Sequence, residues 1–222
     1  MNVQNYRKIK ESLPFHVKLV AVSKTKPIED ILALYHEGQR LFGENKAQEL
    51  IAKYEALPQD IKWHFIGHLQ SNKIKYIAPF VSLIHSIDSL KLLQEVNKQA
   101  MKNDRIIPCL LQFHIALEET KFGFSIEECE AMLADPALQE LKNIVLVGVM
   151  GMATFTDDEE LIRGEFIRLK KYFDQLKSNH FLHNPDFKEI SMGMTDDYAI
   201  AMEEGSTLIR IGSAIFGTRI NS

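Results

Sequence analysis

Residues 19–27 read LVAVSKTKP, an apolar run that ends on Lys24 shortly before Pro27. Lysine is rarely buried, so a lysine at the end of such a run indicates a site, an exposed surface or a partner charge. Lys24 alternates with Val20 and Val22, which places the three side chains on one face of a predicted strand. Pro27 is typical of the first turn of a helix. The run therefore predicts a strand followed directly by a helix.

The same alternation of strand and helix continues along the whole chain. Several of the β-rich runs are apolar on both faces, as parallel strands covered by helices require. Eight such strands predict a (β/α)8 barrel, with an extra helix at about residues 2–13. A doubly wound open sheet is the alternative, but its expected glycine-rich turn after the first strand is missing from SKTKP. The predicted strands are 17–24, 40–45, 63–68, 82–88, 107–115, 144–152, 188–194 and 207–217.

The amino-acid composition argues against a disordered, a nucleic-acid-binding or a membrane protein. With 45% hydrophobic and 25% charged residues, the 222-residue chain is an ordinary globular one, and no flexible linker divides it. We expect one domain over residues 1–222, with the barrel at about 17–219. The net charge of -4 gives no basic surface for nucleic acid. Without a membrane-length apolar run or secretory signal, and with two cysteines, we expect a cytoplasmic protein with no membrane partner.

Three helix starts are predicted from residues that commonly cap helices. Two of them have the spacing of a capping box, in which a hydroxyl side chain and a glutamate three residues later satisfy free backbone N–H groups. The third combines a threonine with two aspartates in front of a helix that ends at Gly205. They are Ser125 with Glu128, Thr156 with Glu159, and Thr195 with Asp196 and Asp197.

Lys24 is the first candidate for chemistry. In a barrel of this type the active groups lie at the carboxyl ends of the strands, which here are much more polar than the strand bodies. A lysine in a partly desolvated barrel mouth has its amine favoured over its ammonium, and becomes a nucleophile toward aldehydes and ketones. The alternative is a lysine that extends from the strand end into solvent.

The last strand supplies two further candidates, in RIGSAIFG (210–217). Gly212 and Ser213 open a short helical segment whose backbone N–H groups can face an anion, and the loops after the last two strands are the usual phosphate site. Ser191 can add a hydroxyl donor. Arg210 points inward and requires an acceptor, because it cannot lose its proton. The alternatives are a tight turn that needs glycine and a barrel carboxylate that pairs with the arginine.

Together, a lysine that can form an imine, a phosphate cradle and an arginine point to one ligand, pyridoxal 5′-phosphate (PLP). Its aldehyde would meet Lys24, and its ring nitrogen would meet Arg210. Its phosphate would meet Ser191, Gly212 and Ser213. The remaining sequence offers no metal site, because HFIGH (64–68) has two spaced histidines but lacks the glutamate of zinc-binding helices.

At these residues the chain resembles a known family, the pyridoxal-phosphate homeostasis proteins, which are relatives of the N-terminal barrel of alanine racemase. The resemblance runs in order from about residue 17 to 219. The motifs that carry it are VAVSKTKP, LFGENKAQEL, WHFIGHLQSNK, GVMGM, SMGMTDD and STLIRIGSAIFG. It implies a Schiff base on Lys24, Arg210 at the pyridine nitrogen, Asn45 lining the cofactor, and phosphate contacts from Ser191, Gly212 and Ser213.

The resemblance implies a monomer that buffers or delivers PLP in the cell through a reversible Schiff base, with no dedicated catalytic reaction. Apo forms of PLP-dependent enzymes are its candidate partners. His64, Lys26 and Lys121 receive no definite role, although the two lysines are candidates for the rim of the site.

Two kinds of enzyme are the rival interpretations. The first is an amino-acid racemase that uses PLP, which needs a second base opposite the lysine. All the tyrosines map to helices or helix starts, and because the chain stops at Ser222 we expect no second domain to supply one. The second is an aldolase that forms a Schiff base with a sugar phosphate, in which Arg210 would have no evident role.

Overall fold

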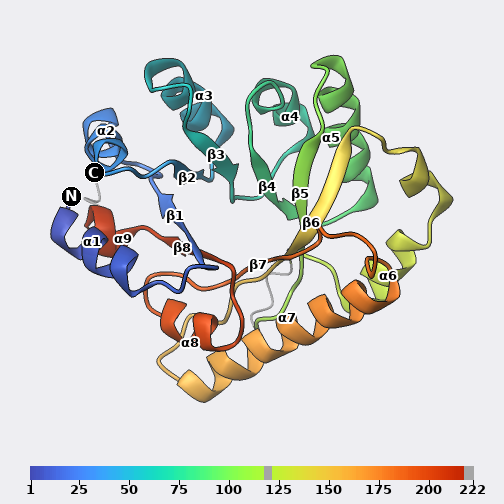
Figure 1. Cartoon of the computed structure of the whole chain (residues 1–222). Coiled ribbons are helices and arrows are strands. Elements are labelled where there is room, and N and C mark those ends of the chain that lie inside the picture. Colours follow the sequence, from blue (N-terminus) through green and yellow to red (C-terminus); the bar gives the residue numbers. More distant parts are fainter. Residues whose placement is uncertain (118–121, 218–222) are drawn as a thin grey trace.

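Eight parallel strands close into a barrel in chain order, from β1 to β8, and β8 pairs with β1 (Figure 1). The computed structural model describes residues 1–117 and 122–217. This topology confirms the predicted (β/α)8 barrel and excludes the open sheet. The strands are β1 (Lys18–Val22), β2 (Leu41–Glu44), β3 (Lys62–Phe65), β4 (Leu83–Ile87), β5 (Ile107–Gln112), β6 (Ile144–Met150), β7 (Glu189–Ser191) and β8 (Leu208–Ile211).

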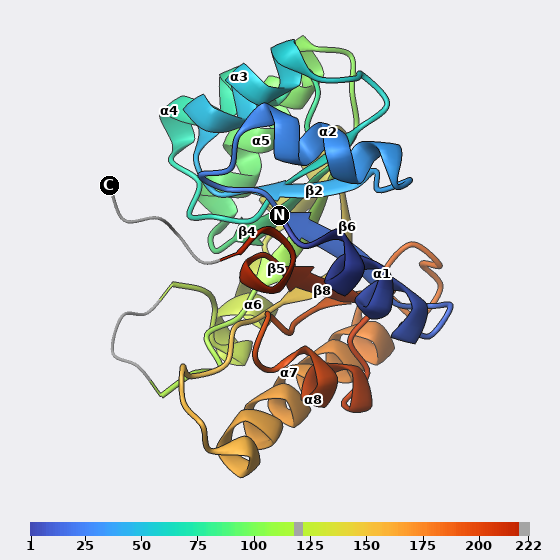
Figure 2. The ribbon, with the colours of Figure 1, turned by 90° about the vertical axis from the view of Figure 1, so that its left-hand side faces the viewer.

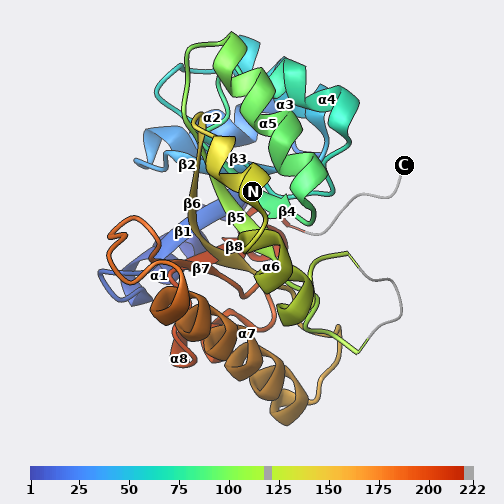
Figure 3. The same ribbon diagram turned by 90° about the vertical axis from the view of Figure 1, so that its right-hand side faces the viewer.

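Helices cover the outside of the barrel. Figures 2 and 3 show that α2 to α5 gather on one side of it, and that α6, α7 and α8 lie on the other. Within the described ranges, no helix is both long and apolar enough to cross a membrane. The helices are α1 (Val3–Ser12), α2 (Ile28–His36), α3 (Ala47–Ala56), α4 (Ser71–Ile77), α5 (Leu90–Lys102), α6 (Ile126–Leu133), the 3-10 helix η1 (Pro136–Glu140), α7 (Glu159–Asn179), α8 (Tyr198–Glu203) and α9 (Ser213–Phe216).

Apolar side chains form two separate cores. The larger one fills the layer between the strands and the surrounding helices, as both faces of a parallel sheet require. The smaller one lies inside the barrel and consists of Val20, Leu83, Leu110, Met150 and Leu208. This interior cluster is small, so polar side chains occupy the rest of the space along the barrel axis.

Gly148 allows β6 and β7 to approach each other closely. Its φ is +153°, and a Cβ atom there would lie 1.8 Å from the carbonyl oxygen of Glu189. The pairing of β6 with β5 shifts its register beside this residue. Val145 and Val147 face the barrel interior before the shift, whereas Met150 faces it afterwards. The irregularity therefore changes which side chains of β6 reach the carboxyl end of the barrel.

One of the predicted capping boxes is confirmed and one is wrong. The Ser125 hydroxyl accepts a hydrogen bond from the Glu128 N–H, and the Glu128 carboxylate accepts one from the Ser125 N–H. At α7 the cap is instead Asp158, and Thr156 lies outside the helix. The Asp158 carboxylate accepts hydrogen bonds from two N–H groups of the first turn. An aspartate immediately before Glu159 satisfies these donors without a longer reach by the threonine.

The segment after β7 also differs from its prediction. The strand stops at Ser191 and does not continue to residue 194. Of the three residues predicted to cap α8, Asp197 holds the N-cap position, and Thr195 lies two residues before it. The Asp197 carboxylate accepts a hydrogen bond from the Met194 N–H, which joins the two ends of the turn formed by residues 194–197. Thr195 is therefore available to face the barrel mouth.

Candidate functional site

A cavity of about 440 Å³ opens at the carboxyl ends of the strands. This volume lies within the range of small-molecule sites, roughly 300–1,000 Å³. All the predicted contact residues line the cavity except Ser191. The lining consists of Val22, Lys24, Lys26, Asn45, Ile66, Gly67, His68, Gln112, Phe122, Met152, Phe155, Met194, Thr195, Asp196, Arg210, Gly212, Ser213 and Gly217.

Lys24 lies in the turn that follows β1 and is half-buried. Its predicted face is confirmed, since Val20 belongs to the interior core and Val22 lines the cavity together with the lysine. The turn is closed by a hydrogen bond of 3.0 Å from the Lys26 N–H to the Ser23 carbonyl. The chain thus turns away from the barrel while Lys24 still faces the cavity.

Arg210 is buried in the wall of the same cavity. Its Nη1 donates a hydrogen bond of 2.5 Å to Ser191 Oγ, and its Nη2 donates one of 3.0 Å to the Gly151 carbonyl. Burial lowers the pKa of Arg210 to about 10, against the opposing effect of the Asp197 charge, so the guanidinium stays protonated near pH 7. Among the described residues, no carboxylate accepts a hydrogen bond from it. The guanidinium therefore keeps N–H groups for an acceptor in the cavity.

Ser191 lies beneath Arg210, fully buried and outside the cavity lining. Its Oγ is 2.9 Å from Nδ1 of His85, and Nε2 of His85 is 2.9 Å from Nδ1 of His64. Arg210 can only donate, so the Ser191 oxygen accepts from it and its own proton is free for His85. The hydrogen-bonded chain then runs from Ser191 to His85 and from His85 to His64. The direct phosphate contact of Ser191 stays a prediction, and the structure adds a supporting position under the arginine.

Both histidines of this chain are held neutral by their burial. Burial, together with the smaller effect of the nearby Lys18 charge, lowers the pKa of His64 to about 3. Burial also lowers the pKa of His85 well below its usual value, with further lowering by His64 and Arg210. His64 borders a second hollow of about 360 Å³ at the amino ends of the strands. The polar chain therefore crosses the barrel from that end to the floor of the candidate site.

Two hydroxyls and a stretch of backbone form the part of the cavity beside β8. Ser213 Oγ donates a hydrogen bond of 3.1 Å to Thr195 Oγ1, and both residues line the cavity. Gly212 brings the chain close to β1, since a Cβ atom there would lie 3.2 Å from the Val22 carbonyl oxygen. In the part of the chain that the structure describes, the N–H groups of residues 212–214 donate no hydrogen bond. This group offers several donors to an anion.

Thr195 was predicted as part of a helix cap, and its place beside Ser213 in the cavity was not predicted. The signal was available, because the threonine follows SMGM at the end of a predicted strand. His85 was also missed, although it alternates with Leu83 on the inward face of its strand. A histidine at an inward position of a buried strand indicates a hydrogen-bonded partner in the barrel interior.

The opposite wall of the cavity combines apolar side chains with a close backbone contact. The His68 ring packs against Phe122 with the ring centroids 4.6 Å apart. A Cβ atom on Gly67 would lie 2.4 Å from the backbone oxygen of Asn45, so glycine lets the ends of β2 and β3 touch. Lys26 donates hydrogen bonds to two carbonyls at the end of α9, at 3.1 and 2.9 Å. Lys121 lies outside the described residues.

Three polar strand ends do not line the cavity. They are Glu44, Asp88 and His114, although each comes at the end of a predicted strand. Asp88 lies 3.6 Å from Nδ1 of His68 and thus contacts a lining residue from behind. A polar residue at a strand end therefore does not by itself predict that the residue lines the site.

The fold and this site define the class of protein. Residues 3–220 match the family model of the alanine racemase N-terminal domain. The alanine racemase of Clostridium difficile 630 has the same fold, with a TM-score of 0.75 at 16% identity over 99% of this chain and 56% of that one. The chain is thus a barrel of the alanine racemase N-terminal type.

Closer relatives define the family within this class. The pyridoxal phosphate homeostasis protein of Aquifex aeolicus is 39% identical over 91% of this chain and 87% of its own, and that of Synechocystis is 39% identical over 97% of both. The structure of PipY from Synechococcus elongatus without PLP has a TM-score of 0.89 at 32% identity, covering 98% of this chain and 100% of that one. PipY with PLP bound has a TM-score of 0.85, covering 96% and 99%. The chain belongs to the family of pyridoxal phosphate homeostasis proteins.

Proposed function

We propose that this protein binds PLP in the cavity at the carboxyl ends of its strands and takes part in the homeostasis of that cofactor. It buffers or delivers PLP through a reversible Schiff base on Lys24 and has no dedicated catalytic reaction. The observation that carries the proposal is that Lys24, Arg210 and the Thr195–Ser213 hydroxyl pair all line one cavity. The names of the relatives and the PLP-bound structure of PipY support the same ligand.

The chemistry of the lining residues fits PLP. When bound, PLP supplies an aldehyde that condenses with an amine, and Lys24 offers one from the turn that follows β1. The hydroxyls of Thr195 and Ser213, with the backbone at Gly212, offer donors to a phosphate. Arg210 offers N–H donors to the ring nitrogen, and Asn45 also lines the cavity.

The state of Arg210 favours a carrier over a catalyst. Its guanidinium stays protonated near pH 7, so it donates to the ring nitrogen and holds that nitrogen unprotonated. An unprotonated ring is a weaker electron sink, which disfavours transamination. A racemase of this class needs a second base, and none of the tyrosines, all of which lie in described segments, lines the cavity. Amino-acid racemisation is the second candidate, favoured by the shared alanine racemase fold.

One experiment separates the carrier from the enzyme. Purified protein is loaded with PLP, excess ligand is removed, and the complex is mixed with an apo enzyme that requires PLP. The carrier role predicts that activity appears in the acceptor while D- and L-amino acids are not interconverted in a chirality assay. Racemisation that is lost in Lys24→Ala would support the enzyme, and a wild type that cannot be loaded with PLP would reject both.

We further propose a monomeric protein of the cytoplasm, with apo PLP-dependent enzymes as partners and neither nucleic acid nor membranes among them. The net charge of -4 supports the exclusion of nucleic acid. Light scattering of the loaded protein should give the mass of one chain, 25.5 kDa. A mass of two chains would contradict the monomer.

A further inference from the structure

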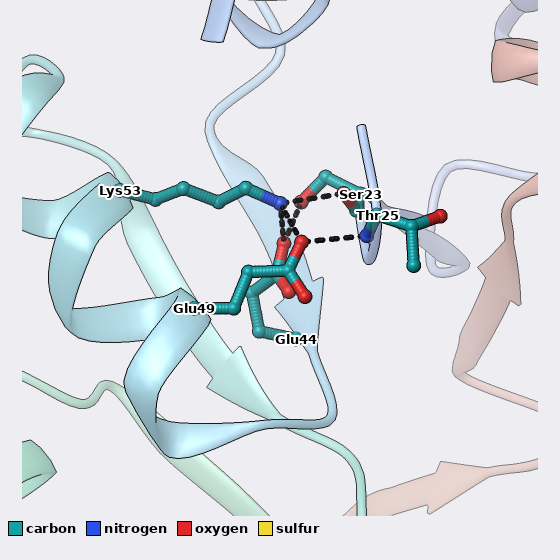
Figure 4. A network of polar contacts seen from close by, with 5 residues as sticks. All are labelled: Ser23, Thr25, Glu44, Glu49 and Lys53. Atoms are coloured by element: carbon teal, nitrogen blue, oxygen red, sulfur yellow. Dashed lines mark hydrogen bonds and ion pairs between the residues drawn. The ribbon is translucent and has the colours of Figure 1, made fainter. Parts of the chain in front are cut away.

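A buried polar network lies directly behind the turn that carries Lys24 (Figure 4). Its centre is Lys53 of α3, whose side chain is only 6% exposed. Lys53 Nζ donates three hydrogen bonds, to the Ser23 carbonyl at 2.7 Å, to Glu44 Oε1 at 2.7 Å and to Glu49 Oε1 at 2.6 Å. An ammonium has three protons, so Lys53 is fully used.

The network holds the residues on both sides of Lys24. Ser23 is bound twice, through its carbonyl to Lys53 and through its hydroxyl to Glu44 Oε1 at 2.6 Å. The Thr25 N–H donates a hydrogen bond of 2.6 Å to Glu49 Oε1. Because both neighbours in the chain are anchored to one cluster, the backbone of Lys24 has little freedom to move.

Thr25 adopts a backbone conformation that the network has to support. Its φ is +66°, in the left-handed region that suits glycine or asparagine and disfavours a β-branched residue. Such a residue is strained and persists only where its surroundings determine its conformation. The hydrogen bond from Thr25 to Glu49 supports this conformation, together with the bond from the Lys26 N–H to the Ser23 carbonyl that closes the turn.

A contribution to the stability of the fold is a weak explanation for the presence of this buried polar network. Glu44 is fully buried, and its Oε2 has no hydrogen-bond partner among the described residues. Burial raises the pKa of Glu44, although Lys53 and Ser23 act in the opposite direction. Buried ion pairs of this kind stabilise a fold little, because apolar side chains of similar volume do as well or better. The network contacts both neighbours of Lys24, so its role is better sought in the position of that lysine than in overall stability.

We propose that Glu44, Glu49 and Lys53 are positioning residues for Lys24. By clamping Ser23 and Thr25 they set where the lysine amine lies in the cavity before the ligand enters. This inference rests on the proposed function, in which the Lys24 nitrogen attacks the aldehyde carbon of PLP, a C=N bond forms and the carbonyl oxygen leaves as water. A misplaced amine slows this covalent step but leaves the donors to phosphate and ring in place.

The test compares a ligand that can react with one that cannot. Pyridoxine 5′-phosphate keeps the ring and the phosphate of PLP, but it carries an alcohol in place of the aldehyde and forms no Schiff base. Glu49→Ala removes the acceptor of the Thr25 N–H, and Glu49→Gln keeps an acceptor oxygen there. Glu55→Ala makes the same chemical change on the exposed face of α3 and is the matched control.

For Glu49→Ala we expect Schiff-base formation with PLP, followed by stopped-flow absorbance, to slow about tenfold or more. Binding of pyridoxine 5′-phosphate should change by less than about twofold, and Glu49→Gln should recover most of the rate. Lys53→Met should behave like Glu49→Ala. If Lys53→Met does not fold, Glu49→Ala carries the test, because its side chain is 23% exposed.

Three results would overturn the inference. Schiff-base formation at the wild-type rate in folded Glu49→Ala is the first. The second is a loss of pyridoxine 5′-phosphate binding in Glu49→Ala as large as the loss in the rate of Schiff-base formation with PLP. Such a result would indicate that the whole site has been disturbed. A wild type that forms no Schiff base is the third, and it alone also rejects the proposed function.

Discussion

The hydroxyl of Ser191 lies 2.5 Å from Nη1 of Arg210, on the buried side of the guanidinium and away from the cavity. The serine is thus a support for the arginine, and its second side-chain partner is Nδ1 of His85, at 2.9 Å. This relationship gives the wall of the site a defined donor orientation without any carboxylate in contact with Arg210 among the described residues.

Replacing Ser191 by alanine should weaken the binding of PLP and the binding of pyridoxal to the same extent. Loss of one hydrogen bond to a charged group leaves a buried N–H of Arg210 unpaired, so we expect affinities about 5- to 20-fold lower. Pyridoxal lacks the phosphate, and absorbance titrations of both ligands therefore report on the arginine. A loss confined to PLP would instead assign Ser191 to the phosphate.

The hydroxyl pair beside β8 should behave in the opposite way. Thr195→Val and Ser213→Ala each remove one donor at the group that we assign to the phosphate. Each should lower the PLP affinity by about 5- to 10-fold, and the pyridoxal affinity should stay within about twofold. The same two titrations measure this. Unchanged PLP binding in the double variant would place the phosphate elsewhere.

The barrel and the mouth residues were predictable, because their signals are local. Alternation in residues 19–27 orients Lys24 without knowledge of any other strand. The interior chain of Ser191, His85 and His64 was not predictable, since its members lie on three strands far apart in sequence. Which inward polar residues meet depends on the stagger of the strands, and no local pattern encodes that stagger.

Local sequence also failed to predict which residue caps a helix, even among residues close together in the chain. Thr156 and Thr195 are both residues that commonly cap helices, and both lie near a helix start. In each case an aspartate holds the N-cap position and the threonine lies outside the helix, although only Asp158 accepts hydrogen bonds from the first turn. Propensity places a helix start to within a few residues, whereas the choice between adjacent capping residues depends on the path of the loop.

Two glycines should respond to alanine with opposite signs. Gly148→Ala puts a Cβ atom 1.8 Å from the Glu189 carbonyl oxygen and should lower the free energy of unfolding. We expect a loss of about 3 kcal/mol or more, or no folding at all. Gly164→Ala, in the exposed interior of α7 with open space around it, should add about 0.5–1 kcal/mol. Urea denaturation measures both, and a tolerated Gly148→Ala would contradict the close approach of β6 and β7.

Acid should destabilise the protein through His64. Its folded pKa is about 3 and an unfolded histidine has a pKa near 6.5, so between these values only the unfolded chain takes up the proton. The stability is full above pH 6.5 and is lost as the pH falls toward 3. From pH 7 to pH 5, the wild type should lose about 2 kcal/mol more than His64→Gln in urea denaturation. Equal losses would mean that His64 is not held neutral.

The most direct test of the account is the site of covalent attachment. PLP is added to the purified protein, the absorbance is recorded, borohydride is added, and the reduced adduct is mapped by mass spectrometry. We predict a band near about 420 nm and a single major label on Lys24, both absent in Lys24→Ala. A wild type that stays colourless with PLP, or a label on another lysine that survives Lys24→Ala, would contradict the assignment.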